Sequence, residues 1–272
     1  MHMLIYVGPA PSRDQVIEFC VPLIEKVASS VTLLACGGDD NQDLLNDAVE
    51  HLRIPPHIPL TQWVLPGNAQ TAILKAARKG SFDMVILGRL NQPIGRLLPG
   101  SHSKVIAQRL KPSAIRVHGP ARPIRRILIA SGGDHHTFDD VNVTADVAVP
   151  LAASVTLMHV VSQQSLLFEG FASEPFSADA FIASDTPEAT VLRKAGDILR
   201  KRGVETQIKS RIGPVIDEII AELRVGDYDL LVIGAHRAET ALDRLLFEDL
   251  TDELLDLAAL PVLIARRNED EV

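Results

Sequence analysis

The sequence contains few cysteines and no recognisable targeting or membrane segment. Cys20 and Cys36 are its only cysteines among 272 residues, which is too few for a disulfide framework and predicts a reducing, cytoplasmic setting. Residues 1–14 lack the basic start and the apolar stretch of a secretory signal, so none is expected. Residues 147–168 are poor in charge, but Pro150 and several polar residues interrupt them, and we expect no membrane contact.

Clustered positive charge is also lacking. The formal net charge is −8 and no run of lysine or arginine stands out, which predicts no nucleic-acid partner. The sequence shows neither a nucleophile elbow nor paired metal-binding carboxylates. An enzymatic activity therefore stays uncertain, and the pattern weighs against one.

The most informative feature that is present is an internal repeat. The chain is 46% hydrophobic and 23% charged, which is an ordinary globular balance. Residues 67–88 align without a gap over residues 213–234, matching Gly67 to Gly213 and Asp83 to Asp229. Upstream, residues 31–35 align over residues 155–159 at a shorter offset, so the second half carries about 22 extra residues. The segment 162–186 is the candidate insertion.

The repeat predicts two domains, one at 1–119 and one at 125–268, with the insertion near 162–186 in the second. The proline- and arginine-rich stretch 118–126 is interpreted as their linker. In each half, short apolar runs alternate with amphipathic segments, which is typical of a parallel sheet covered on both faces. In the first half we expect strands near 4–7, 31–35, 60–64, 84–88 and 113–117, and helices near 15–28, 43–52, 69–78 and 101–110.

The landmark strands of the second half carry a family resemblance. The segments RRILIASGG, ASVTLMHVV, DYDLLVIGAH and LPVLIAR stand in the order and spacing of the universal stress protein (UspA) family, and the chain resembles a tandem member of it. The resemblance implies two Rossmann-like, adenine nucleotide alpha hydrolase-like domains, each a five-stranded, mainly parallel sheet with helices on both faces. It also implies a pseudo-twofold pairing of the two domains through their last strands.

In the first half, the loop after the fourth strand resembles the nucleotide loop of that family. ATP-binding members show glycine, two residues, glycine, nine residues, then glycine with serine or threonine. Here Gly88, Asn91, Gly100 and Ser101 occupy these places, with one residue fewer in the long gap. Glycines let the backbone approach phosphates, and a helix start at Ser101 would favour an anion. Asn91 tolerates the positive φ of a turn.

The same first-half site departs from the family pattern elsewhere. The first strand ends without the family's aspartate, and Cys36 replaces an aliphatic residue on the adenine side. The resemblance therefore implies a degraded site for ATP or AMP, formed by the four loop residues with Cys36 beside the base. Arg89, Arg96 and Lys104 flank the loop and would either attract phosphate or remain ordinary solvated charges.

The second half departs further. Arg237 replaces the second glycine, and Glu248 and Asp249 stand where the final glycine and serine would be. Carboxylates at a helix start stabilise the helix but repel a triphosphate. We expect no nucleotide in the second half.

Two weaker candidates follow the first strand of the second half. Residues 130–137 faintly resemble the phosphate loop of ATP pyrophosphatases, although a plain strand-to-helix turn is the favoured interpretation. Asp134, His135 and His136 do not predict a metal site. Adjacent histidines point in different directions, and no third ligand can be named to complete the set that zinc needs. His159 is interpreted as a satisfied core histidine.

The insertion concentrates phenylalanine. Phe168, Phe171, Phe176 and Phe181 fall within 14 residues. A long loop of this kind either covers its own domain as a strap or serves as a lid or partner site. The strap is favoured.

These observations predict a universal stress protein-type, cytoplasmic stress-response protein that acts by binding and signalling. The alternative is an interaction scaffold that binds no nucleotide, and a slow ATP hydrolase comes third. Besides the intrachain pairing of the domains, the resemblance leaves room for a homo-oligomer and for an unidentified protein partner.

Overall fold

The computed structural model describes residues 1–38, 41–90, 110–161, 178–234 and 250–266. These residues divide into two compact units. The first comprises Met1–Pro123 together with the segment that begins at Ala259, and the second is Ile124–Ala258. The change of unit at Pro123 falls within the predicted linker, whereas the last strand of the sequence groups with the first unit.

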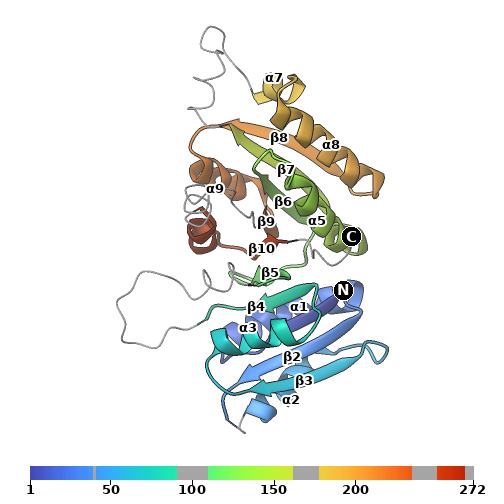
Figure 1. The fold of residues 1–272 in the computed structure, drawn as a ribbon, viewed down its shortest axis with the longest axis vertical. Helices are drawn as coiled ribbons and strands as arrows, with labels where there is room; N and C mark the ends of the chain where they lie inside the picture. The colour runs from blue at the N-terminus through green and yellow to red at the C-terminus, as the bar shows by residue number, and fades with distance from the viewer. Residues whose placement is uncertain (39–40, 91–109, 162–177, 235–249, 267–272) are drawn as a thin grey trace. The chain divides into compact units, whose positions relative to one another are not determined.

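The first unit is a mainly parallel sheet with helices on both faces (Figure 1). Its sheet has the order β3-β2-β1-β4-β5, with β10 beside β5. The elements are β1 His2–Tyr6, α1 Ser12–Val27, β2 Ser30–Cys36, α2 Asn41–Leu52, β3 Leu60–Leu65, α3 Ala69–Lys79, β4 Met84–Leu87, β5 Ser113–Arg116 and β10 Val262–Ala265. The helix predicted near 101–110 lies outside the described residues.

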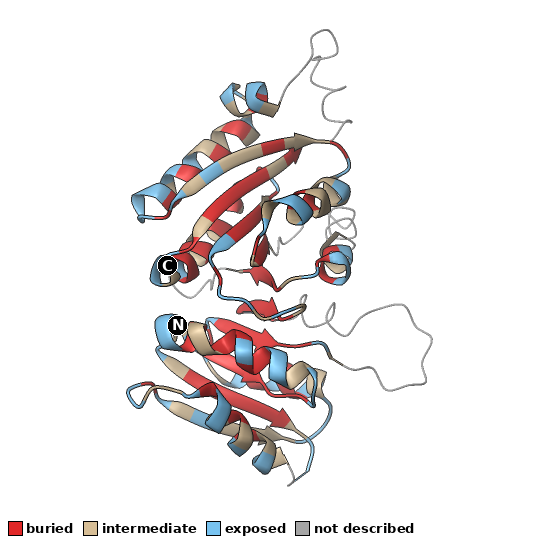
Figure 2. Ribbon diagram, turned by 180° about the vertical axis from the view of Figure 1, so that it is seen from behind, coloured by how far each residue is buried: buried red, intermediate tan, exposed pale blue. Residues whose placement is uncertain are grey.

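Alternate strand residues of the first unit point to opposite faces of the sheet. Leu4, Leu34 and Val85 pack in one hydrophobic cluster with Ile73 of α3. Helices α1 and α2 contact each other. Strands β1, β2, β4 and β5 are almost wholly buried (Figure 2), as expected for a parallel sheet covered on both faces, whereas the outer strand β3 is only partly buried.

The last strand completes the first unit. β10 pairs antiparallel with β5, placing Leu263 opposite Ile115 and Ile264 opposite Ala114. Ser113 locks the end of this pair, because its Oγ donates to the carbonyl of Arg266 at 2.9 Å and accepts the Arg266 N–H at 2.9 Å. The predicted pairing of the last strands of the two repeats is therefore confirmed.

The second unit repeats the same order with additions. Its four strands are all parallel, in the order β9-β6-β7-β8. The elements are β6 Arg126–Ser131, α5 Thr137–Leu151, β7 Ser154–Val161, α7 Ala178–Ala183, α8 Pro187–Lys201, β8 Thr206–Ile212, α9 Val215–Gly226 and β9 Leu230–Gly234. Residues 250–257 are also helical.

Helices cover both faces of the second sheet as well. A Cβ on Gly196 of α8 would come within 2.7 Å of Ile208 of β8, so this residue points toward α8. The neighbouring Lys209 bonds Glu222 of α9 instead. Because successive strand residues face opposite sides, α8 and α9 lie on opposite faces, and the predicted fold class is confirmed.

Local sequence signals explain where several helices begin. Asn68 caps α3 by accepting the Thr71 N–H at 2.9 Å, and the helix carries Arg78 and Lys79 in its last turn, where they oppose the helix dipole. Thr186 caps α8 in the same way, with Pro187 following at the first helical position.

The matched aspartates of the repeat have a structural role. Asp83 Oδ2 accepts the His2 N–H at 2.7 Å at the start of β1. In the second unit, Asp229 Oδ2 accepts the N–H groups of Arg125 and Arg126 at 2.9 and 3.0 Å at the start of β6. Each aspartate thus ties the start of its fourth strand to the start of its first.

Candidate functional site

The edge where the parallel strands of the first unit end is the expected place for a ligand. Tyr6 ends β1, Cys36 ends β2, and Gly88 directly follows β4. The structure therefore brings Gly88 and Cys36 to the same edge of one sheet. Asn91, Gly100 and Ser101, the other predicted site residues, lie outside the described residues, as do Arg96 and Lys104. Arg89 is exposed beside Gly88.

Gly88 lies against the beginning of α1. A Cβ at this position would overlap Ser12 Oγ and would lie 3.0 Å from Val16 Cγ2 and 3.2 Å from the Ser12 carbonyl oxygen. These contacts leave no room for a side chain. The backbone that leaves β4 is thus held close to the start of α1, and glycine at position 88 permits this packing.

Cys36 forms part of a half-buried apolar surface at this edge. Its Sγ lies 3.2 Å from the hydroxyl of Tyr6, and burial together with this hydrogen bond raises the pKa of Tyr6. Leu65, Ala69 and Leu90 are likewise partly buried against the hydrophobic cluster. We call Cys36, Leu65, Ala69 and Leu90 the apolar rim. A flat, uncharged group such as a base suits such a surface.

The turn that follows the first strand of the second unit, β6, is closed by its own hydrogen bonds. The Gly133 N–H donates to Ser131 Oγ at 3.0 Å, and that Oγ lies 2.7 Å from Thr137 Oγ1. The His136 N–H donates to Asp134 Oδ1 at 3.0 Å. N–H groups that a phosphate would need are already bonded, which supports the strand-to-helix turn rather than a phosphate loop.

His159 is satisfied within the core of the second unit. Its Nδ1 lies 3.0 Å from the Ser131 carbonyl oxygen, and its ring stacks on Phe181 with centroids 5.4 Å apart. Burial lowers the pKa of His159, although the Ser131 hydrogen bond and the charges of Glu188 and Asp134 oppose that shift. These contacts agree with the predicted core histidine.

Part of the insertion is a strap. Phe181 of α7 is buried, and Arg193 Nη1 donates to the carbonyl oxygens of Ile182 and Ser184 at 2.6 Å each. Ser210 Oγ donates to the Ala178 carbonyl at the other end of α7. Phe168, Phe171 and Phe176 lie outside the described residues. No sequence pattern predicts that Phe181 stacks on His159, since the two are 22 positions apart.

The second unit contains an ionic network around the buried Glu222 that no sequence pattern predicted. The carboxylate of Glu222 accepts from Lys209 Nζ at 2.8 Å, from Arg211 Nη2 at 2.8 Å and from the Tyr228 hydroxyl at 2.7 Å. Burial alone would raise the pKa of Glu222, but these hydrogen bonds lower it to about 2. The paired charges stabilise the ionised form of Glu222 and join β8 to α9.

Within the described residues, no three or more histidine, cysteine, aspartate or glutamate side chains are arranged to hold a metal. Arg237, Glu248 and Asp249 lie outside those residues. No helix in the described part of the chain is both long and apolar enough to cross a membrane.

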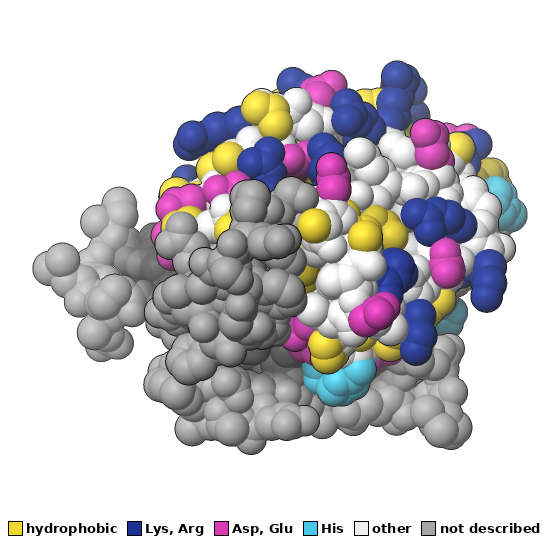
Figure 3. All heavy atoms as spheres, turned by 90° about the horizontal axis from the view of Figure 1, so that it is seen from above, with side chains coloured by type: hydrophobic (Ala, Val, Ile, Leu, Met, Phe, Trp, Pro, Cys, Tyr) yellow, Lys and Arg dark blue, Asp and Glu magenta, His cyan; other side chains and the backbone are white. Residues whose placement is uncertain are grey.

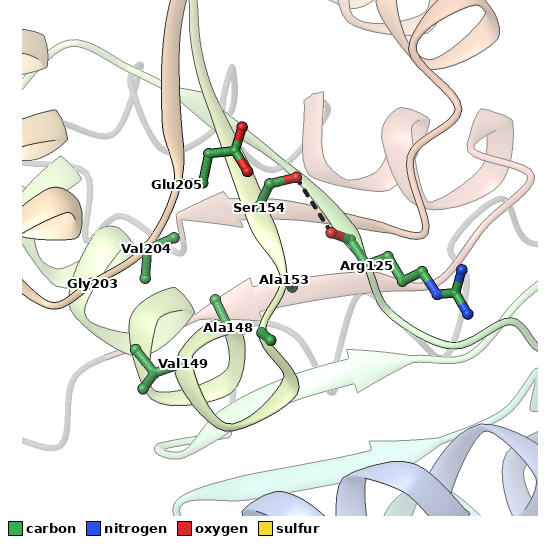
Figure 4. A pocket seen from close by; sticks show the side chains of 9 residues that line it. Arg125, Ala148, Val149, Ala153, Ser154, Gly203, Val204 and Glu205 are labelled. Atoms are coloured by element: carbon green, nitrogen blue, oxygen red, sulfur yellow. Dashed lines mark hydrogen bonds between the residues drawn. The ribbon is translucent and has the colours of Figure 1, made fainter.

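A shallow pocket of about 360 Å³ lies at the opposite edge of the second sheet, where strands begin (Figure 4). Arg125, Ser154 and Glu205 line it together with the end of α5 and the residues that follow α8. Ser154 Oγ donates to the Arg125 carbonyl at 3.3 Å, while the guanidinium of Arg125 points away from Glu205 (Figure 4). This pocket contains none of the predicted site residues.

Charges of both signs are mixed on the face shown in Figure 3. Two ion pairs of the second unit likewise join opposite charges, Arg200 with Asp197 at 3.0 Å within α8 and Arg202 after α8 with Asp146 of α5 at 2.7 Å. The visible, described part of this face therefore carries no continuous basic patch of the kind that nucleic acids require.

Two Rossmann-like α/β units, with a glycine loop leaving the fourth strand of the first, define the class of this protein. The model of the universal stress protein family matches residues 123–266, which is more than half of the chain. The chain therefore belongs to the universal stress protein family. No curated protein matches the sequence.

Solved structures share the fold along the whole chain. A universal stress protein from Archaeoglobus fulgidus is 15% identical with a TM-score of 0.71, covering 99% of this chain and 97% of its own. A functionally unknown protein from Pseudomonas aeruginosa is 16% identical with a TM-score of 0.67, covering 98% and 93%. The cytoplasmic domain of a prokaryotic cation chloride cotransporter is 13% identical with a TM-score of 0.61, covering 99% and 96%. At these identities the likeness concerns the fold.

Proposed function

We propose that the protein is a cytoplasmic stress-response protein that acts by binding an adenine nucleotide, ATP or AMP, in its first unit. The observation that carries this proposal is the placement of Gly88. Its backbone leaves β4 pressed against Ser12 and Val16 at the edge where parallel strands end, with no room for a Cβ. Asn91, Gly100 and Ser101 follow in the same loop and would receive the phosphates.

The apolar rim supports the same assignment. Cys36, Leu65 and Leu90 offer a partly exposed apolar surface at this edge, on which a base would pack. Cys36 would then lie beside the base and the loop beside the phosphates. The proposal places no nucleotide in the second unit, because Glu248 and Asp249 stand in its sequence where the family pattern has glycine and serine.

Calorimetry with ATP and with AMP on the intact protein tests this proposal. We expect binding to the native protein and its loss in Gly100→Asp, because a carboxylate at the predicted helix start repels phosphate. Ser29→Asp is the matched control, since it adds the same charge on an exposed residue at the start of β2, the opposite edge of the sheet.

Two results would contradict the proposal. Absence of heat with both nucleotides would favour the interaction scaffold that binds no nucleotide. Heat that persists in Gly100→Asp would place the nucleotide elsewhere. Phosphate release above a protein-free blank would be required for the third alternative, a slow ATP hydrolase.

A further inference from the structure

The outer strand of the first unit directs backbone groups away from its sheet. Among the strands that the structure describes, β3 ends the order of the first sheet and pairs with β2 alone (Figure 1). The Val31 N–H of β2 donates to the Pro59 carbonyl at 2.9 Å, which sets the side of the strand that faces β2. Alternate residues direct their N–H and C=O groups to opposite sides of a strand. The residues whose backbone groups face outward are therefore Leu60, Gln62 and Val64.

Proteins usually protect such an edge with charged side chains or with a covering element. The matching strand of the second unit, β8, has both. It contains Lys209 and Arg211, and α7 packs against it, with Ser210 Oγ donating to the Ala178 carbonyl. The first unit has no counterpart of α7, because α2 begins soon after β2 ends, and residues 58–66 contain no charged residue. Within the described part of the chain, the edge of β3 thus lacks both protections.

The same strand carries the only tryptophan of the chain, Trp63. Its side chain is half-buried against the hydrophobic cluster of the first unit. Tryptophan is enriched in protein interfaces, and most of all among the residues that contribute most to binding. An apolar edge strand with a partly exposed tryptophan indicates a protein partner that adds a strand to the sheet.

The sequence of β3 is complementary to itself in the antiparallel direction. A twofold axis at Gln62 places Leu60 opposite Val64 of a second copy, and Gln62 opposite Gln62 of that copy. These are the residues with outward backbone groups, so each pair exchanges N–H···O bonds. On the other face of the sheet, Thr61 lies opposite Trp63 of the second copy. The pairing brings apolar residues and a threonine–tryptophan pair together, and no like charges face each other along the strand.

We propose that two copies of the chain associate through β3, with the two strands antiparallel about a twofold axis at Gln62. The pairing uses the same outward groups in both copies, so it closes at two chains. It joins the first units of two molecules into one continuous sheet. This interface goes beyond the proposed function and does not depend on nucleotide binding.

Sedimentation velocity on the intact protein over a range of concentrations tests the proposal. We expect a monomer–dimer equilibrium. Fluorescence of Trp63 reports on the same surface without a label, because the chain has no other tryptophan. Dilution should shift its emission to longer wavelength over the concentrations at which the dimer dissociates, since dissociation exposes the ring to water.

A pair of charge variants tests the position of the axis. Gln62→Lys and Gln62→Glu each place two like charges opposite each other, and each should weaken the dimer at least about tenfold. An equimolar mixture of the two variants should associate again, because the lysine of one then faces the glutamate of the other. Gln207→Lys is the matched control, since it adds the same charge to an exposed residue of the outer strand β8, and it should leave association unchanged.

Several results would overturn the proposal. A native protein that stays monomeric at its highest soluble concentration would do so, and so would open-ended assemblies in place of a dimer. A dimer that persists in both charge variants, or whose dissociation leaves the Trp63 emission unchanged, would place the interface on another surface. Failure of the mixed variants to associate more strongly than either variant alone would contradict the axis at Gln62.

Discussion

Single residues determine how closely the chain can pass at the end of β4. Gly88 has Ser12 and Val16 in the space that a side chain would occupy. Glycine is therefore needed for packing here, whether or not a ligand is bound. Measuring both the stability and the nucleotide binding of one variant separates its role in packing from its proposed role in binding.

We predict that Gly88→Ala lowers the free energy of unfolding by about 1–3 kcal/mol, because the added methyl overpacks against Ser12 and Val16. Urea unfolding measures this. Gly38→Ala is the control, since nothing lies within 4 Å of the added Cβ, and it should change stability by less than about 0.5 kcal/mol. Equal stability of the two variants would contradict the crowding at Gly88.

At the scale of elements, the two units differ in the contacts around equivalent helices and strands, α3 and β3 in the first unit and α9 and β8 in the second. In the first unit, Trp63 of β3 contacts Phe82 edge-on at 5.9 Å, and Lys79 lies 4.9 Å over the Trp63 ring. In the second unit, the repeat replaces Trp63 by Lys209 and Phe82 by Tyr228, which bind Glu222. The first unit thus has an aromatic contact where the second has an ionic network.

This network predicts a difference in acid stability. Because the pKa of Glu222 is lowered to about 2 in the folded protein, its contribution is complete above its ordinary value of 4.5 and is lost as the pH falls toward 2. Glu222→Gln should flatten the fall of melting temperature between about pH 4.5 and pH 2. An unchanged acid slope in this variant would contradict the assignment.

The strap α7 gives a second prediction at this scale. Phe181→Ala should lower the free energy of unfolding by about 3 kcal/mol, because a buried ring is lost. It should also raise the pKa of His159 toward its ordinary value of 6.5, since the stacked ring contributes to the burial that lowers it. NMR titration of His159 measures this, with Phe181→Leu as the apolar control, and an unchanged pKa in Phe181→Ala would contradict it.

Much of the element order could be predicted from the sequence because parallel strands and their helices have strong periodic patterns. The repeat added register: matching Asp83 to Asp229 identified two residues with the same backbone partners. Contacts between distant side chains could not be predicted. Glu222 with Lys209, and Phe181 with His159, depend on which helix face meets which strand, and no local pattern specifies that. Of the candidate site, Gly88 and Cys36 are placed at one edge, and the loop residues remain a prediction.

At the scale of the whole molecule, a strand from late in the sequence belongs to the unit that the early residues form. β10 comes from the second repeat but belongs to the first unit, where Leu263 lies opposite Ile115. The two compact units are therefore not the two sequence repeats.

We predict that Leu263→Asp weakens the first unit although the residue lies at the other end of the sequence. Leu263 is fully buried, and a charge there should cost about 3 kcal/mol. Hydrogen exchange should show lost protection at Ala114 and Ile115 of β5, with β7 unaffected. Leu257→Asp, on a side chain that is 52% exposed, is the control. Retained protection of β5 in Leu263→Asp would contradict the role of β10.

The position of β10 has a consequence for biosynthesis. A ribosome makes the strand Val262–Ala265 long after the other strands of the first unit have emerged. Domains commonly fold in the order of their synthesis. Here the strands of the first unit that are made before β5 must wait for β10 before their sheet is complete, so a chain terminated before Val262 would leave β5 with a bare edge.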